Sequence, residues 1–338
     1  MIGAFVCGCS GVQLTAGEKG FLRDSQPWGL IVFRRNIDNP DQLRALIGEF
    51  REIVGRRNAP VLVDQEGGRV QRMGPPSNYW RKYPAARRFG EIFAADPVKG
   101  VRLTRTLARL MAADLHEVGI NVDCLPVLDV PQPDGHDVIG DRAYAGLPAD
   151  VSILARQTMI GMLNGGVLPV IKHIPGHGRA TADSHLGLPV VNASRAELEA
   201  VDFPPFAALA DAPIAMTAHV IYSAIDPAAP ATHSPPVIEV IRKTIGFDGL
   251  LMTDDLSMKA LTGDMADRVL RAREAGCDMM LHCNGIMSEM TAVAVASGEL
   301  RGRADSRARA ALRQLRRPQK FDRNRAVADL AELQLVPA

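Results

Sequence analysis

Short apolar segments recur along nearly the whole chain, and each is followed by a loop and an amphipathic helical pattern. Apolar runs bounded by turn residues are typical of strands, and their alternation with helices is typical of a parallel sheet covered by helices. We predict eight strands, at residues 2–6, 29–33, 59–63, 121–127, 167–171, 214–219, 249–253 and 278–282. This count predicts an α/β fold, a single (β/α)8 TIM-type barrel with a C-terminal helical tail.

Apolar residues at helical spacing predict the helices between these strands. They lie at residues 41–54, 101–118, 151–163, 195–209, 236–244 and 266–275. The first opens with Asn39-Pro40-Asp41, which is a typical helix cap. Residues 74–93, in contrast, contain several prolines and are too irregular for a tight turn, so we expect them to cross the top of the barrel.

The end of the chain carries a different pattern. Residues 301–317 form a basic helical segment with a narrow apolar stripe, which predicts a tail helix packed on the barrel with its arginines solvated. The sequence contains no linker that would separate a second large domain. We therefore expect a catalytic barrel domain at 1–300 and a C-terminal helical extension at 301–338 that packs against it.

Charge and cysteine content limit the classes of partner and the cellular compartment that the sequence predicts. Lys and Arg number 39 against 38 Asp and Glu, so the net charge of +1 favours neither nucleic acid nor an anionic membrane surface. A neutral small-molecule substrate is easiest to accommodate. The five cysteines lie in or beside apolar runs and predict reduced core thiols in a cytoplasmic protein. The N-terminal apolar run is too short for a secretion signal and lacks its basic flank. No stretch matches a membrane span. A monomer is the default expectation.

Candidate chemistry is densest at residues 172–185, KHIPGHGRATADSH, directly after a predicted strand. The strand delivers Lys172 and His173 at its carboxyl end, where the substrate site of a TIM barrel lies. Asp183 and His185 are two residues apart. A carboxylate that close to an imidazole can fix its tautomer and favour its protonated form, which suits a general acid near neutral pH.

Other predicted strand ends also carry polar residues. Asp64 and Arg72 flank a Gly-Gly pair that allows a tight turn, and both are free to point into the barrel mouth. Arg142 is either a planar donor for sugar hydroxyls or an amide carbonyl, or a partner that holds Asp141 in place. His219 is equally well a satisfied core residue or a wall of the cavity.

Two adjacent acids follow the seventh predicted strand, Asp254 and Asp255. Neighbouring residues of an extended chain face opposite sides, so one acid can enter the site while the other caps a helix or pairs outside it. If Asp254 faces inward, it is a carboxylate placed to attack or stabilise an electrophilic carbon.

Four motifs together resemble glycoside hydrolase family 3: KHIPGHG at 172–178, DSH at 183–185, TDDLSM at 253–258 and DQEGGRVQR at 64–72. Within that family the chain is most similar to the single-domain bacterial β-N-acetylglucosaminidases (β-hexosaminidases) of peptidoglycan recycling. The resemblance implies Asp254 as nucleophile, His185 as general acid/base and Asp183 as the residue that orients His185. It implies substrate binding by Asp64, Arg72, Arg142, Lys172 and His173, a loop-shaping role for His177, and neither metal nor cofactor.

The implied reaction is retaining hydrolysis of a terminal β-linked N-acetylglucosamine (GlcNAc) from muropeptides such as GlcNAc-anhydroMurNAc, through a covalent glycosyl-aspartate. A histidine replaces the second carboxylate of the usual template. Three alternatives stay open: a β-N-acetylglucosaminide phosphorylase on the same fold, since a neutral imidazole repels phosphate less than a carboxylate; a metal-dependent barrel hydrolase using the same histidines and acids; and a muropeptide-binding sensor without turnover.

Overall fold

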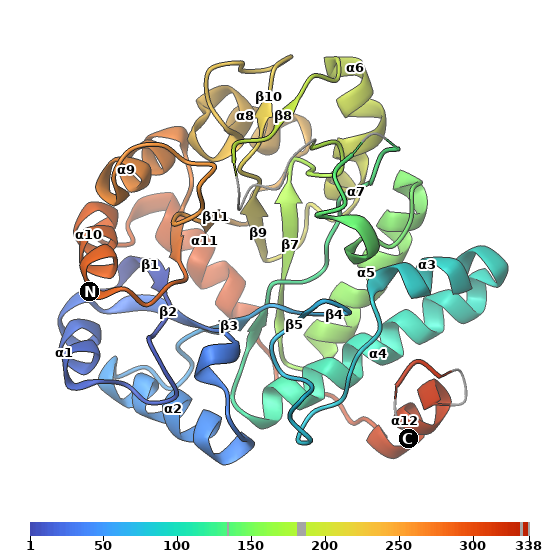
Figure 1. The fold of residues 1–338 in the computed structure, drawn as a ribbon, viewed down its shortest axis with the longest axis horizontal. Coiled ribbons are helices and arrows are strands. Elements are labelled where there is room, and N and C mark those ends of the chain that lie inside the picture. Colours follow the sequence, from blue (N-terminus) through green and yellow to red (C-terminus); the bar gives the residue numbers. More distant parts are fainter. Residues whose placement is uncertain (134, 181–186, 332–333, 337–338) are drawn as a thin grey trace.

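The computed structural model describes residues 1–133, 135–180, 187–331 and 334–336, and eight of its strands form a closed parallel barrel (Figure 1). Around the barrel the strands run in chain order, and the last pairs with the first. They are β1 (Gly3–Cys7), β2 (Pro27–Val32), β3 (Val61–Val63), β6 (Val122–Asp123), β7 (Leu168–Ile174), β9 (Ile214–Thr217), β11 (Leu250–Asp255) and β12 (Met279–His282). Each predicted strand overlaps one of these, so the TIM-type barrel is confirmed.

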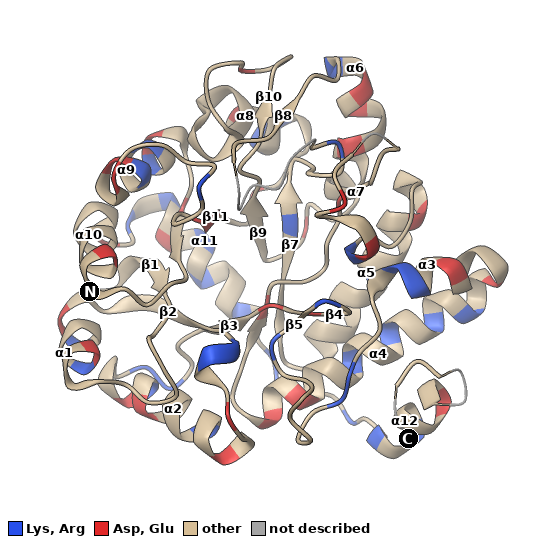
Figure 2. Cartoon of the chain, viewed as in Figure 1, with Lys and Arg blue, Asp and Glu red and all other residues tan. Residues whose placement is uncertain are grey.

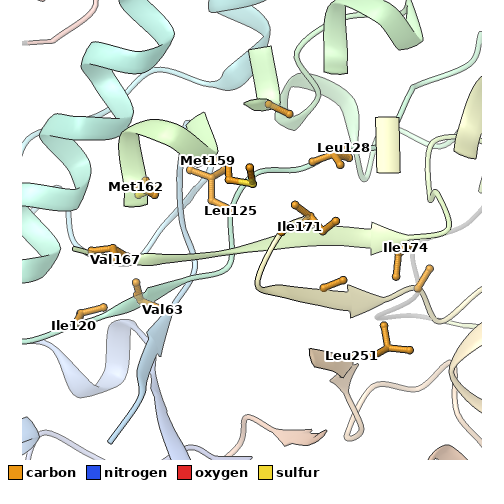
Figure 3. Close-up of a cluster of buried hydrophobic side chains, with 14 of the residues drawn as sticks. Val63, Ile120, Leu125, Leu128, Met159, Met162, Val167, Ile171, Ile174 and Leu251 are labelled. Atoms are coloured by element: carbon orange, nitrogen blue, oxygen red, sulfur yellow. The ribbon is translucent and has the colours of Figure 1, made fainter. Parts of the chain in front are cut away.

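The strands are apolar on both faces because each face is buried in a different core. Inward-facing side chains such as Val6, Leu62 and Met252 fill the barrel. Outward-facing side chains such as Val63, Ile171 and Leu251 pack under the surrounding helices, and Figure 3 shows this layer between the strands and neighbouring segments. A parallel strand covered on both sides lacks the polar alternation of an exposed sheet.

Helices surround the barrel as the alternating pattern predicts (Figure 1). They are α1 (Ala16–Ser25), α2 (Pro40–Ile53), α3 (Ala86–Ala95), α4 (Pro97–Glu117), α5 (Pro148–Asn164), α6 (Arg195–Glu197), α7 (Phe203–Ala208), α8 (Pro235–Glu239), α9 (Met265–Ala275), α10 (Met287–Ser297), α11 (Gly302–Arg313) and α12 (Arg323–Ala331). The predicted cap of α2 is present, since the Asn39 side chain accepts hydrogen bonds from the Asp41 and Gln42 amides. No helix in the described part of the chain is long and apolar enough to cross a membrane.

Three predicted segments differ in detail. The helix predicted at 195–209 is α6, a π-helical stretch at Leu198–Asp202 and α7, and the one predicted at 236–244 is α8 followed by a π-helical stretch at Val240–Thr244. The expectation of an irregular path over 74–93 is wrong at its end, because α3 begins at Ala86. Its buried Ala86 and Phe89 provide the apolar stripe that the prolines before it obscure.

Helix α11 packs against the end of the barrel at which the strands begin. Its Ala308 and Ala311 are buried in the same cluster as the inward-facing strand residues. The expectation that its arginines are solvated is wrong for Arg307, whose side chain is only 14% exposed and lies 3.0 Å from Asp278. The thiol prediction is confirmed, since all five cysteines are free and buried.

Candidate functional site

The first wall of the site is a hairpin that follows β3 at the carboxyl end of the barrel. Strands β4 (Gln65–Gly67) and β5 (Val70–Gln71) pair in antiparallel fashion, with Asp64 just before them and Arg72 just after. Gly67 and Gly68 make the turn with φ of +91° and +57°, where a side chain is strained. A Cβ on Gly67 would also collide with the Pro84 carbonyl oxygen. The tight Gly-Gly turn is present as predicted, and it brings Asp64 and Arg72 together.

A row of alternating charges, here called the charge chain, extends across the site from this hairpin. Its members are Arg72, Asp64, Lys172, Glu66 and Arg142. Arg72 Nη2 lies 3.0 Å from Asp64 Oδ2, and Lys172 Nζ lies 2.9 Å from Asp64 Oδ1 and 2.6 Å from Glu66 Oε1. Glu66 also accepts two hydrogen bonds from Arg142, each 2.8 Å long. Figure 2 shows both signs of charge where β4, β5 and β7 meet. Because Lys172 and Glu66 are each 3% exposed, these pairs are buried and orient one another.

Ion pairing keeps the acids and bases of the charge chain ionised. Burial opposes ionisation of both carboxyls, but Lys172 and Arg72 hold the pKa of Asp64 well below its ordinary value. Arg142 and Lys172 likewise lower the pKa of Glu66 to about 2. Burial also opposes protonation of Lys172, yet Asp64 and Glu66 raise its pKa. The cavity therefore holds fixed donors and fixed acceptors near neutral pH.

A second group centres on Asp129, which follows β6. Asp129 Oδ2 lies 2.7 Å from His173 Nδ1, and Oδ1 accepts hydrogen bonds from the backbone amides of His173 and His177 at 3.2 and 2.7 Å. The fully buried Asp129 would resist ionisation, but His173 and His177 lower its pKa to about 2. An ionised Asp129 favours the His173 tautomer with its proton on Nδ1. His173 Nε2 is then an acceptor, 3.5 Å from Arg142 Nη2.

Asp254 and Asp255 end β11 and behave differently, as the sequence predicts for neighbouring acids. The Asp255 side chain binds neighbouring segments of the protein: it accepts hydrogen bonds from the Ser257 hydroxyl at 2.6 Å and from the Cys283 amide at 3.1 Å. Asp254 lines the cavity, and its Oδ1 accepts the Asp255 amide at 2.8 Å. Burial acts to raise the pKa of Asp254, but the surrounding His219, His173, Asp255 amide and Lys172 outweigh it and lower that pKa.

The two groups and Asp254 enclose one cavity of about 110 Å³. It brings together every described residue that the sequence predicts for the site: Asp64, Arg72, Arg142, Lys172, His173 and Asp254. The predicted acid/base His185 and its partner Asp183 lie outside the described residues. The cavity has the carboxylate, the donors and the acceptors that a polyhydroxylated ligand requires.

Two ionisable residues that line the cavity, Glu66 and His177, are missing from the predicted catalytic and substrate-binding set. Glu66 joins Arg142 to Lys172, and its position two residues after Asp64 in an extended segment is a signal that both point the same way. His177, for which the resemblance implies a loop-shaping role, lines the cavity. Its ring lies edge-on to His173, and its buried Nδ1 has no hydrogen-bond partner among the described residues. Burial lowers the pKa of His177 to about 4, so this ring is neutral near pH 7.

Two open alternatives are decided by contacts. The alternative in which Arg142 holds Asp141 is wrong, because Asp141 pairs with Arg69 at 3.1 Å while Arg142 is engaged by Glu66. His219 is a satisfied core residue. Its side chain is fully buried, with one ring nitrogen 2.7 Å from the Thr232 hydroxyl and the other 3.0 Å from the Asp255 carbonyl oxygen.

A metal site of the kind considered from the sequence requires a cluster of ligands. Among the residues that the structure describes, no group of three or more His, Cys, Asp and Glu side chains is arranged to hold a metal ion. The buried cation Lys172 lies between the carboxylates Asp64 and Glu66, and Arg72 and Arg142 pair with them as well, so their charges are already balanced. The metal alternative also draws on His185 and Asp183, which are not among these residues.

Comparison of the chain with known proteins identifies its family. The model of the glycosyl hydrolase family 3 N-terminal domain matches residues 9–314. A protein named beta-hexosaminidase from Methylococcus capsulatus is 42% identical over 279 residues, which are 81% of this chain and 80% of the relative. One of the same name from Alkalilimnicola ehrlichii is 40% identical over 84% of this chain and 81% of its own.

Solved structures agree. Native NagZ from Neisseria gonorrhoeae aligns with a TM-score of 0.81 and 31% identity over 98% of each chain. The same protein in complex with N-trifluoroacetyl-D-glucosamine aligns with a TM-score of 0.82. The family model covers most of this chain, and the relatives are matched over four fifths of their length. This protein therefore belongs to glycoside hydrolase family 3.

Proposed function

We propose that this chain is a retaining exo-β-N-acetylglucosaminidase that releases terminal β-linked GlcNAc from peptidoglycan-derived muropeptides through a covalent glycosyl-aspartate. One observation carries the proposal: Asp254, a buried carboxylate with a lowered pKa, lines the same cavity as the charge chain of Arg72, Asp64, Lys172, Glu66 and Arg142. An ionised carboxylate can attack an anomeric carbon, and the charge chain can hold the sugar that contains it.

The general type of activity is supported by the relatives. The chain is a glycoside hydrolase of the β-hexosaminidase type, since its family and its relatives at about 40% identity agree on that chemistry. A solved neighbour binds an N-acylated glucosamine, N-trifluoroacetyl-D-glucosamine, which supports a small sugar as the ligand of this cavity.

The charge chain suits sugar hydroxyls, because each hydroxyl both donates and accepts hydrogen bonds. The carboxylates of Asp64 and Glu66 accept, whereas Arg72, Lys172 and Arg142 donate. All of these side chains are held by their mutual ion pairs before a ligand arrives. Little side-chain entropy is then lost on binding, and the ring can be oriented with its anomeric carbon toward Asp254.

The reaction proceeds in two displacements. An Asp254 oxygen attacks the anomeric carbon and forms an ester bond, while the bond to the leaving oxygen breaks and that oxygen takes a proton from His185. His185 then removes a proton from water, whose oxygen attacks the same carbon and releases the sugar and the free carboxylate. Asp183, two residues from His185, orients and tunes the imidazole. These two roles follow from the family motif.

Trapping tests the central step. A 5-fluoro glycoside of GlcNAc slows release of the covalent intermediate, so mass mapping should find the sugar on the tryptic peptide 244–259, with fragmentation assigning it to Asp254. Asp254→Asn should yield no adduct and no turnover, whereas Asp255→Asn, one position away, should keep the adduct if it folds. A label on any residue other than Asp254 would refute the assignment.

The acceptor and the natural substrate need separate assays. In phosphate buffer we expect free GlcNAc, whereas GlcNAc 1-phosphate as the main product would establish the phosphorylase alternative. GlcNAc-anhydroMurNAc carrying a peptide should be cleaved with a higher kcat/KM than N,N′-diacetylchitobiose, and the reverse order would contradict the muropeptide proposal. A cytoplasmic location is part of the same proposal, because free buried thiols are typical of that compartment.

A further inference from the structure

The C-terminal helix α12 lies far from the cavity in sequence but is connected to its first wall. After α11 the chain returns along the outside of the barrel, and α12 lies beside α4 (Figure 1). The Gln319 amide donates to the Asn164 carbonyl oxygen at 2.9 Å, and Arg109 stacks over the Phe321 ring at 4.6 Å. Buried Ala326 and Leu330 then seat the helix. The segment is therefore fixed to α4 and α5 through both polar and apolar contacts.

One residue of α12 reaches a buried acid on α4. Arg323 Nη2 forms an ion pair with Asp114 Oδ1, and its Nη1 lies 2.7 Å from Glu117. Asp114 is 3% exposed, and its other oxygen accepts a hydrogen bond of 2.5 Å from the Tyr83 hydroxyl. Arg81 lies 3.8 Å from that same oxygen. Asp114 thus joins the tail helix to the segment around Tyr83.

Tyr83 in turn supports the hairpin of β4 and β5. It is fully buried, its amide donates to the Gln71 side chain at 2.9 Å, and its carbonyl oxygen accepts the Gly68 amide at 2.9 Å. The Gln71 side chain also donates to the Arg81 carbonyl oxygen at 2.5 Å. The Gly67 backbone is packed directly against Pro84, because a Cβ on Gly67 would collide with the Pro84 carbonyl oxygen. This hairpin carries Glu66 within β4 and leads directly into Arg72, and both line the cavity.

We propose that α12 is a positioning element for the sugar site: Arg323, through Asp114 and Tyr83, holds the β4–β5 hairpin so that Glu66 and Arg72 keep their places in the cavity. The proposal rests on the proposed function for its substrate. Its physical basis is that an acid as buried as Asp114 needs its partners, and losing one leaves the others to rearrange. Coupling of this kind between contacting groups typically changes binding by a few-fold to about 30-fold.

The test uses Arg323→Met, which keeps the aliphatic stem but removes the charge. KM for an aryl β-N-acetylglucosaminide should rise roughly threefold to tenfold, with kcat changed less than about twofold. The Kd for GlcNAc, measured by calorimetry, should rise by the same factor. Arg323→Lys should restore most of the affinity. Tyr83→Phe, which removes only one oxygen, should raise KM similarly, and the double variant should raise it by less than the product of the two.

The matched control is Arg102→Met. Arg102 also links α4 to α12, through Asp329 at 3.3 Å, but does not contact Asp114. It should leave KM and Kd unchanged. The proposal is overturned if Arg323→Met and Tyr83→Phe lower Tm but keep the wild-type KM, or if Arg102→Met raises KM equally. If Arg323→Met does not fold, Tyr83→Phe alone decides. A wild-type protein that releases no GlcNAc refutes the proposed function instead, and the Kd comparison then still tests the positioning role.

Discussion

Glu66→Gln is the sharpest test of how the cavity is held together. Glu66 accepts two charge-assisted hydrogen bonds from Arg142, forms an ion pair of 2.6 Å with Lys172, and is 3% exposed. Glutamine has nearly the same shape but is neutral, and its NH2 group must face one of these cations. The substitution therefore removes the charge and one acceptor without leaving a cavity.

Two routes give the size of the effect. A contact between charged groups contributes about 1 kcal/mol more than its neutral counterpart, so the two hydrogen bonds from Arg142 and the ion pair with Lys172 amount to about 3 kcal/mol. The lowering of the Glu66 pKa from 4.5 to about 2 corresponds to about 3 kcal/mol in favour of the charged form, at about 1.4 kcal/mol for each pKa unit. The agreement makes a loss of about 3 kcal/mol in the free energy of unfolding the expected result.

Both stability and catalysis should register the change. Urea denaturation measures the unfolding free energy, and hydrolysis of an aryl β-N-acetylglucosaminide measures kcat/KM. If half of the loss is expressed at the sugar site, kcat/KM falls about tenfold, since 1.4 kcal/mol is a factor of ten. The control is Glu91→Gln, which makes the same chemical change in an exposed pair with Arg88 and should cost less than about 1 kcal/mol. A Glu66→Gln protein with wild-type stability and kinetics would refute the reasoning.

Two further outcomes follow from the buried groups. Asp129→Asn should lower kcat/KM by about tenfold to a hundredfold, because it removes the charge that fixes the His173 tautomer; kinetics at wild-type level would contradict that role. Acid should weaken the fold below pH 6.5: burial lowers the pKa of His177 and His233 to about 4 from 6.5, so the unfolded state takes up protons first and stability falls between pH 6.5 and 4. Burial raises the pKa of Asp202 to about 6, so its protonation stabilises the folded state over much of the same range and offsets part of the loss. The urea midpoint should therefore fall between pH 7 and pH 5, and it should fall further for the wild type than for His233→Gln.

The barrel could be predicted from the sequence because its strands are buried on both faces. A run such as Val61–Val63 has no polar face to confuse with a helix, and a Gly- or Pro-containing loop ends it. Helix α10 was not predictable in the same way. Its sequence, MSEMTAVAVAS, alternates small and branched residues and has little helical periodicity, so its helical state comes from packing on β1 and α9.

Most of the candidate site could be predicted because polar side chains at strand ends of a barrel converge on one mouth. Lys172 and Asp254 lie on β7 and β11, Asp64 directly follows β3, and all three line one cavity. Glu66 and Asp129 were missed for different reasons. The spacing of Glu66 from Asp64 is a signal in the sequence, but Glu66 lies in a hairpin with an irregular register that the sequence does not predict. Asp129 is hidden in an apolar run, PVLDV, where a lone charged residue is itself a signal of a buried partner.

The charges of the cavity explain how so many ions can be buried together. Arg72, Lys172 and Arg142 supply three positive charges, and Asp64, Glu66 and Asp254 supply three negative ones, so these six lining residues sum to zero. Burying an unpaired ion costs several kcal/mol, whereas a balanced set satisfies its members mutually. Covalent attachment of a sugar to Asp254 would remove one negative charge and leave a net positive charge facing the ester. In the proposed mechanism that charge would favour the deprotonated form of the attacking water, so the charge balance that stabilises the resting site would also assist the second displacement.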